Sequence, residues 1–154
     1  MNFMRVAIGC DHAGYELKEE IKRVLNSKHV ACEDVGTYST ESCDYPDYVY
    51  KAAQAVVSGT CDKAIFVCKT AAGTSMAANK IRGIRACQVF GVEAAKLSRE
   101  HNDANFLALG DIQDHALVVE IVEAWLGTDF SNEERHVRRL AKLKRIEDGT
   151  YERH

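Results

Sequence analysis

The chain has 154 residues, of which 46% are hydrophobic and 28% are charged, a balance typical of one globular domain. Its 20 Lys and Arg residues against 23 Asp and Glu give a net charge of −3, which excludes a broad basic field for nucleic acid. No apolar run could span a membrane, and Met1–Arg5 leads into a predicted strand without a signal-peptide core. We therefore expect a cytoplasmic protein that binds neither nucleic acid nor membrane.

Apolar patterns predict strands that alternate with helices along the whole chain. In chain order we expect a strand at Arg5–Cys10, a helix at Tyr15–Ser27, a strand at Val30–Val35, a helix at Asp47–Ser58 with Pro46 in its first turn, a strand at Ala64–Val67, a helix ending near Lys80, a strand within Gly83–Val89, a helix at Gly91–His101, a strand at Asn105–Leu109 and a helix at Ala116–Leu126. This alternation indicates an α/β fold with a five-stranded parallel sheet, right-handed crossovers and helices on both faces. Residues 1–154 are expected to form a single domain.

A common strand order for such sheets is 2-1-3-4-5, which makes the first and third strands neighbours. The loop Cys10–His12 would then lie opposite the loop Cys68–Thr70. Ligands of open α/β sheets bind at this point, so we expect the two loops to form one site.

The segment Ala64–Lys80 reads as a buried strand, a tight loop of small residues and a helix. Its helix could be capped by Thr70, Thr74 or Ser75. Cys68 ends the strand, where a helix N-terminus would favour its thiolate. The pattern fits a reactive thiol and a buried structural cysteine equally well.

The tail, residues 131–153, is predicted to be a basic amphipathic helix that opens with a Ser131/Glu134 capping box. Arg135 and Arg139, one turn apart, could clamp a phosphate or carboxylate, although most charge runs are simply solvated. The helix could also reach another subunit.

Five further residues have two possible uses each. His12 could bind phosphate or hold its turn, Asp11 could cap a helix, and Tyr45 could contact substrate or bond within its loop. His101 could be only a C-terminal cap, and the cation of Lys69 is either solvated or promotes the Cys68 thiolate.

Several common site types are absent from the sequence. There is no Gly-x-Gly-x-x-Gly after the first strand, no Walker motif, no Cys-x-x-Cys and no metal-ligand spacing. The six cysteines read as reduced thiols. A thiol, histidines, an aspartate and the loop of small residues after Cys68, which could bind an anion, suit proton transfer on a small anionic substrate without cofactor or metal.

Motifs along nearly the whole chain, from about Arg5 to Ile146, resemble type B ribose-5-phosphate isomerase. They are Gly9-Cys10-Asp11-His12-Ala13-Gly14, Asp44-Tyr45-Pro46, Cys68 through Asn79-Lys80, Gly83-Ile84-Arg85-Ala86, Ser98 through Asn105 and Arg135-His136. The resemblance implies a Rossmann-like three-layer αβα sandwich that works as a homodimer or dimer of dimers. It also implies an aldose–ketose isomerase of the pentose phosphate pathway, which interconverts ribose 5-phosphate and ribulose 5-phosphate through an enediolate without metal or cofactor.

The resemblance further implies roles for particular residues. Cys68 is the expected base, and His101, helped by Thr70, opens the sugar ring. Loop amides from Lys69 to Gly73 would stabilise the oxyanion. The remaining expected substrate contacts, some from a partner subunit, are Asp11, His12, Tyr45, Lys69, Ala71, Ala72, Gly73, Ser75, Asn102, Arg135, His136 and Arg139.

Three departures from the family pattern bear on activity. Lys69, Ala71 and Ala72 stand in a loop that usually reads Cys-Gly-Thr-Gly-x-Gly, and a Cβ forced into positive φ there costs roughly 1–2 kcal/mol. Ile112 stands near a usual arginine, for which Lys69 could substitute, and Glu133-Glu134 replaces usual glycines. Alternatives are therefore an isomerase of a tetrose or hexose phosphate, or a sugar-phosphate-binding protein without turnover. A flavodoxin-like signalling module ranks last, because no acidic phosphoacceptor cluster is present.

Overall fold

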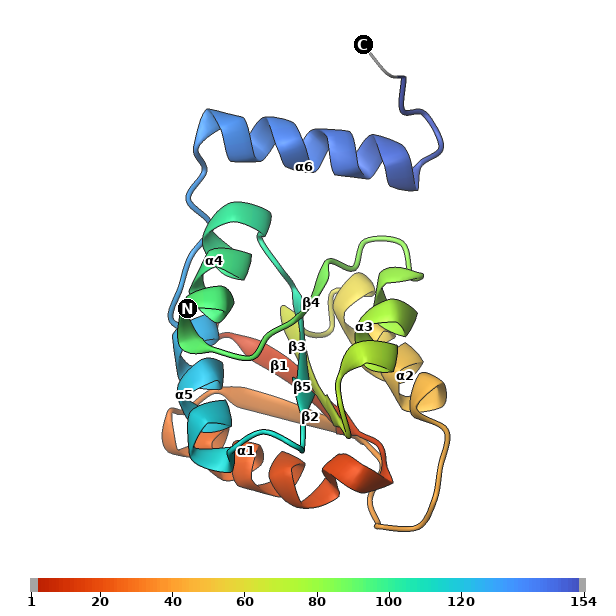
Figure 1. Ribbon diagram of the computed structural model, residues 1–154, viewed down its shortest axis with the longest axis vertical. Coiled ribbons are helices and arrows are strands. Elements are labelled where there is room, and N and C mark those ends of the chain that lie inside the picture. The colour runs from red at the N-terminus through yellow and green to blue at the C-terminus, as the bar shows by residue number, and fades with distance from the viewer. Residues whose placement is uncertain (1–2, 153–154) are drawn as a thin grey trace.

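The computed structural model describes residues 3–152 and contains one parallel sheet with helices on both faces (Figure 1). In chain order the elements are β1 (Arg5–Cys10), the 3-10 helix η1 (His12–Gly14), α1 (Tyr15–Ser27), β2 (Ala31–Gly36), α2 (Tyr45–Val57), β3 (Lys63–Cys68), α3 (Ala72–Asn79), β4 (Ala86–Gln88), α4 (Val92–Asn102), β5 (Phe106–Gly110), α5 (His115–Leu126) and α6 (Glu134–Glu147). The predicted α/β class and three layers are confirmed. Within residues 3–152, no helix is long and apolar enough to cross a membrane.

Two apolar clusters, one on each face, bury the sheet. Helices α1, α4 and α5 cover one face, where the indole of Trp125 is fully buried. Helices α2 and α3 cover the other, around Phe66 and Phe106. The sheet therefore has two accessible edges that run across its strands, one where the strands begin and one where they end.

The strand order is β2-β1-β3-β5-β4, so the predicted order 2-1-3-4-5 is wrong in its last two strands. β5 is buried along its whole length and takes the place beside β3. β4 has only three residues, all half-buried, which suits the edge of a sheet. The difference leaves β1 and β3 adjacent, as predicted.

Two predicted helix starts are also wrong. α2 begins at Tyr45, two residues before the predicted Asp47, although Pro46 does lie in its first turn. α6 spans Glu134–Glu147, shorter than the predicted 131–153, of which residue 153 lies outside the described part of the chain. The expected capping box does not form, because the N-cap is Glu133. The Ser131 hydroxyl accepts from the Glu133 amide at 3.2 Å and is paired with the His136 ring at 2.7 Å.

The loops after β1 and β3 pack directly against each other. The amide of Asp11 donates to the carbonyl of Val67 over 3.1 Å. A Cβ added to Gly14 would lie 2.4 Å from the Val67 carbonyl oxygen, so only glycine permits this approach. The sheet thus brings Asp11 and His12 to the same edge as Cys68.

Candidate active site

Cys68 lies at the end of β3 and its side chain is surrounded by hydrogen-bond donors. The residue is 5% exposed, and its sulfur accepts from the Ala71 amide and from the Thr74 hydroxyl, both at 3.0 Å. Helix α3 begins at Ala72 and directs the positive end of its dipole toward this turn. Two donors and a helix N-terminus favour a sulfur that carries negative charge.

The turn between Cys68 and α3 contains a residue in left-handed conformation. Ala71 has φ 72° and ψ −9°, as the positive φ expected for this loop requires. None of the three predicted caps acts as N-cap: that position belongs to Ala71, and Thr70 Oγ1 only receives a 3.4 Å bond from the Ala72 amide. The small side chains of this loop leave the backbone open to a ligand.

The remaining thiols have different surroundings. Burial raises the pKa of Cys10 to about 12, and its thiol donates to the Thr37 carbonyl at 3.7 Å. Burial raises the pKa values of Cys32 and Cys61 to about 11 and also raises that of Cys87. These four thiols stay protonated near neutral pH, and all six cysteines are free.

Three predicted contacts converge on the same edge as Cys68. The Asp11 carboxylate accepts from the amides of Ala13 and Gly14, so it does cap η1. His12 Nδ1 accepts from the Cys43 amide at 3.3 Å, which holds the proton of a neutral ring on Nε2. The Tyr45 hydroxyl covers the start of α3, where a Cβ on Gly73 would lie only 2.5 Å from it.

The loop after β5 supports the Cys68 turn from its other side. The Asp111 amide donates to the Cys68 carbonyl at 2.8 Å, and the Ile112 amide to the Lys69 carbonyl at 3.3 Å. The Asp111 carboxylate is 3.2 Å from the ring of His115, whose other nitrogen is 3.1 Å from Glu20. Partial burial disfavours the charged ring, but the two carboxylates outweigh it and raise the pKa of His115.

A second group of predicted residues lies at the opposite edge of the sheet. The rings of His101 and His136 are in contact, with 4.3 Å between their centroids and an angle of 34° between their planes. His136 is 2% exposed, and burial, together with the charges of His101 and Arg135, lowers its pKa. Arg135 is paired with Glu133 at 2.8 Å, while Arg139 is exposed.

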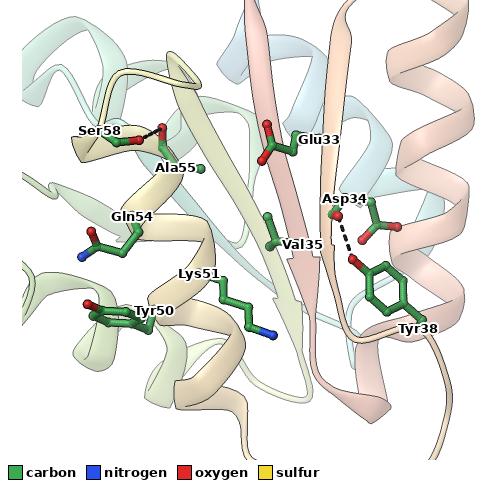
Figure 2. A pocket seen from close by; sticks show the side chains of 9 residues that line it. All are labelled: Glu33, Asp34, Val35, Tyr38, Tyr50, Lys51, Gln54, Ala55 and Ser58. Carbon is green, nitrogen blue, oxygen red and sulfur yellow. Dashed lines mark hydrogen bonds between the residues drawn. The ribbon is translucent and has the colours of Figure 1, made fainter.

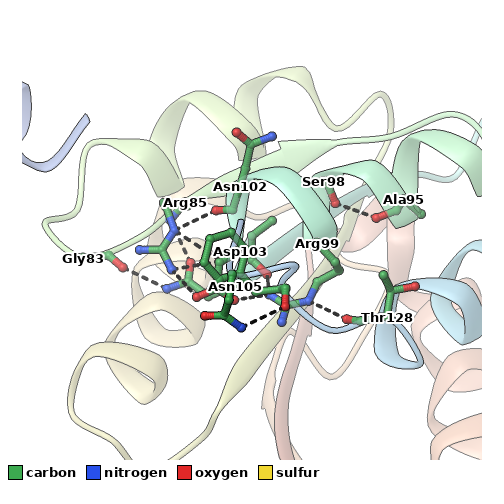
Figure 3. A network of polar contacts seen from close by, with 12 residues as sticks. Gly83, Arg85, Ala95, Ser98, Arg99, Asn102, Asp103, Asn105 and Thr128 are labelled. Carbon is green, nitrogen blue, oxygen red and sulfur yellow. Dashed lines mark hydrogen bonds and ion pairs between the residues drawn. The ribbon is translucent and has the colours of Figure 1, made fainter. Parts of the chain in front are cut away.

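A polar network fixes the end of α4 and therefore this second group. Arg99 donates to the Asp103 carboxylate and the Ala104 carbonyl, and Arg85 donates to the carbonyls of Asn102 and Asp103 (Figure 3). Figure 3 shows the Asn102 side chain pointing away from this network. The backbone of Asn102 is thus held while its amide is presented outward.

Helix α6 is attached to the domain at its two ends. The Ser131 amide donates to the Glu100 carbonyl, and near the other end Glu147 accepts from the Gly83 amide at 2.9 Å. Between these points its apolar stripe stays uncovered, with Val137 and Leu143 each 48% exposed. In Figure 1, α6 lies along the top of the molecule, far from the start of α3.

One chain therefore separates the predicted site into two halves. The first half lies where the strands end and contains Asp11, His12, Tyr45, Cys68, Lys69, Thr70, Ala71, Ala72, Gly73 and Ser75. The second lies where the strands begin and contains His101, Asn102, Arg135, His136 and Arg139. The length of β5 alone separates the edges by about 15 Å.

Two cavities of the described chain lie beside α2. One, of about 510 Å³, lies between β2 and α2, where Tyr38 donates to the Asp34 carbonyl (Figure 2). The other, of about 680 Å³, borders Cys43, whose amide holds His12. Neither of these two cavities is lined by Cys68. Residues 3–152 contain no group of three His, Cys, Asp or Glu side chains placed to hold a metal ion.

Comparison with known proteins assigns nearly the whole chain to the family that its motifs resemble. The family model described as Ribose/Galactose Isomerase matches residues 6–143. The chain belongs to the ribose/galactose isomerase family. Ribose-5-phosphate isomerase B of Escherichia coli is 43% identical over 144 residues, which are 93% of this chain and 96% of that protein.

Solved structures of the same family superimpose closely. Ribose-5-phosphate isomerase B of Clostridium thermocellum has a TM-score of 0.93 and 46% identity, over 95% of this chain and 99% of that one. The enzyme of Mycoplasma genitalium, solved with bound ribulose 5-phosphate, has a TM-score of 0.89 and 34% identity, over 94% and 97% of the two chains. This chain is thus an aldose–ketose isomerase by family.

Proposed function

We propose that this protein interconverts ribose 5-phosphate and ribulose 5-phosphate. The observation that carries the proposal is the Cys68 sulfur, which accepts two hydrogen bonds at the edge of the sheet where the strands end. The relatives named ribose-5-phosphate isomerase B, one with ribulose 5-phosphate bound, support this choice of substrate.

The Cys68 thiolate removes the proton from C2 of the open-chain sugar, which leaves an enediolate. The proton is then returned to C1, while the hydroxyl proton passes from O2 to O1. Ala71 and Ala72 already use their amides within the loop, so those of Lys69, Thr70 and Gly73 remain to stabilise the oxyanion. The step transfers protons only, so it requires no cofactor.

The second half of the site comes, in this proposal, from another copy of the chain. His101 of that copy opens the sugar ring, with Thr70 nearby, and its Asn102 and Asp11 of the first copy hold sugar hydroxyls. Arg135 and Arg139 of the partner bind the phosphate together with His12. His136, expected as a further substrate contact, is buried, and its ring instead packs against that of His101 and orients it.

A homodimer, or a pair of dimers, explains two features of the single chain. The two halves lie about 15 Å apart, too far for one small substrate to touch both. The half-exposed stripe of α6 is apolar surface that a second chain would bury. The free cysteines favour a reducing compartment, so we place the protein in the cytoplasm as a single isomerase domain.

The test is incubation of the purified full chain with ribose 5-phosphate, without added metal or cofactor, while ribulose 5-phosphate is measured. Turnover is expected in the native chain and is expected to vanish in Cys68→Ser, which should fold normally. Exchange of the C2 proton with deuterated water should vanish with it. Turnover of tetrose or hexose phosphates alone would assign a different sugar phosphate as the substrate. Binding of a sugar phosphate without exchange of its C2 proton would contradict isomerase activity. A fully active Cys68→Ser variant would remove the thiol from the mechanism.

A further inference from the structure

Thr74 is a buried threonine whose hydroxyl points at the Cys68 sulfur. It lies in the first turn of α3, is 0% exposed, and its Oγ1 is 3.0 Å from Sγ. A helical threonine usually donates instead to a carbonyl three or four residues before it. Those carbonyls have other donors: the Ser75 amide bonds to Ala71 and the Gln88 side chain to Thr70.

The hydrogen-bond pattern at Cys68 differs in direction from that of the other buried thiols. The thiols of Cys10 and Cys61 donate to oxygen atoms, of Thr37 and Glu33 respectively. Within residues 3–152, the Cys68 sulfur accepts two bonds and donates none. A sulfur in this arrangement is stabilised as the thiolate, because donors prefer the anion and the S–H of a neutral thiol lacks an acceptor.

We propose that Thr74 is a positioning residue whose hydroxyl stabilises the Cys68 thiolate and holds its sulfur in place. The inference rests on the proposed function for its catalytic consequence, but the effect on the thiol can be measured without turnover. The second donor is the backbone amide of Ala71, which no side-chain substitution removes. Thr74 is therefore the part of this arrangement that mutagenesis can test.

Three variants of the full chain separate the hydroxyl from the shape of the side chain. Thr74→Val replaces the hydroxyl with a methyl group, and Thr74→Ser keeps the hydroxyl but removes the methyl group. Thr128→Val is the matched control, because it removes a hydroxyl that donates to the Ala124 carbonyl at 2.6 Å, away from Cys68. Thermal unfolding of each variant shows that it is folded.

The first measurement is the rate of alkylation by iodoacetamide as a function of pH, with the Cys68 peptide quantified by mass spectrometry. A hydrogen bond to a charged group is worth enough to change an ionisation equilibrium roughly tenfold. Thr74→Val should therefore have its pH profile displaced upward by about one pH unit, with a rate lower by up to about tenfold on the rising limb of the profile. At high pH its rate should equal or exceed that of the native chain. Thr74→Ser and Thr128→Val should retain the native profile.

The second measurement is isomerisation of ribose 5-phosphate. For Thr74→Val we expect a similar loss in kcat at neutral pH, recovery at alkaline pH and little change in KM. An alkylation profile that coincides with the native one, or a loss that is equal at every pH, would overturn the assignment. A native chain that isomerises no sugar phosphate, combined with a displaced alkylation profile in Thr74→Val, would refute the proposed function and leave the role of Thr74 intact.

Discussion

A site shared between two subunits predicts that two inactive variants restore each other. Cys68→Ser removes the proposed base from one edge of the sheet, and His101→Gln removes the ring-opening group from the other. Each variant alone should form an inactive dimer, because both of its sites lack one group. In a mixed dimer with two-fold symmetry of the interface, one site lacks both groups and the other lacks neither.

The mixed dimer should therefore recover about half of the native activity per dimer, since one of its two sites is intact. Two affinity tags, one on each variant, allow the mixed species to be purified from co-expressing cells. Its rate with ribose 5-phosphate is then compared with those of the native chain and of each homodimer. The expected value is fixed by counting sites, so it does not depend on the size of either single defect.

The matched control pairs Cys68→Ser with Asp11→Asn. Both residues lie at the edge where the strands end, so each site of that mixed dimer keeps one defect and recovery is not expected. If the Cys68→Ser and His101→Gln dimer is as inactive as its parents, the site is not shared. The separation of about 15 Å would then mean that His101 has no part in the reaction.

Three further predictions test the supporting structure. Gly14→Ala would place a Cβ 2.4 Å from the Val67 carbonyl and should lower the free energy of unfolding by about 1–3 kcal/mol, whereas Gly91→Ala, with nothing within 4 Å, should be nearly neutral in urea titrations. The pKa of His115 is raised in the folded state, so this residue stabilises the fold at pH values below its pKa in the unfolded chain, and the contribution is lost as the pH rises through its pKa in the folded chain. His115→Gln should therefore reduce the dependence of the urea midpoint on pH between these two pKa values. Arg139→Ala should raise KM for ribose 5-phosphate severalfold with little change in kcat; unchanged kinetics would exclude α6 from the phosphate site.

The sequence was sufficient to predict the elements and the neighbouring β1 and β3 loops, because apolar periodicity and βαβ alternation are local signals. It was not sufficient to order β4 and β5. That order depends on which strand is better buried: β5 is wholly apolar over five residues, and β4 has three half-buried ones. Strand length and polarity contain this information, whereas the common order 2-1-3-4-5 does not take them into account.

Two contacts of the site depend on three-dimensional relations that no motif encodes. Ser131 fits a capping box by spacing, yet its hydroxyl is paired with His136, which lies beneath His101. The sequence indicates only a capping role for Thr74, because the direction of its side chain depends on where α3 begins. The helix starts at Ala72, so Thr74 is its third residue, and its hydroxyl is directed at the Cys68 sulfur.

A strained residue in the loop between β3 and α3 connects the backbone conformation with the hydrogen bonding of the Cys68 thiol. Ala71 is held at φ 72°, a conformation that costs an L-residue roughly 1–2 kcal/mol and that glycine would adopt freely. In this conformation its amide reaches the Cys68 sulfur at 3.0 Å and its carbonyl accepts from Ser75. The left-handed residue thus joins the end of β3 to the start of α3 with a donor facing the thiol. Strain persists where the surrounding contacts determine it, and here those contacts are the ones that stabilise a thiolate.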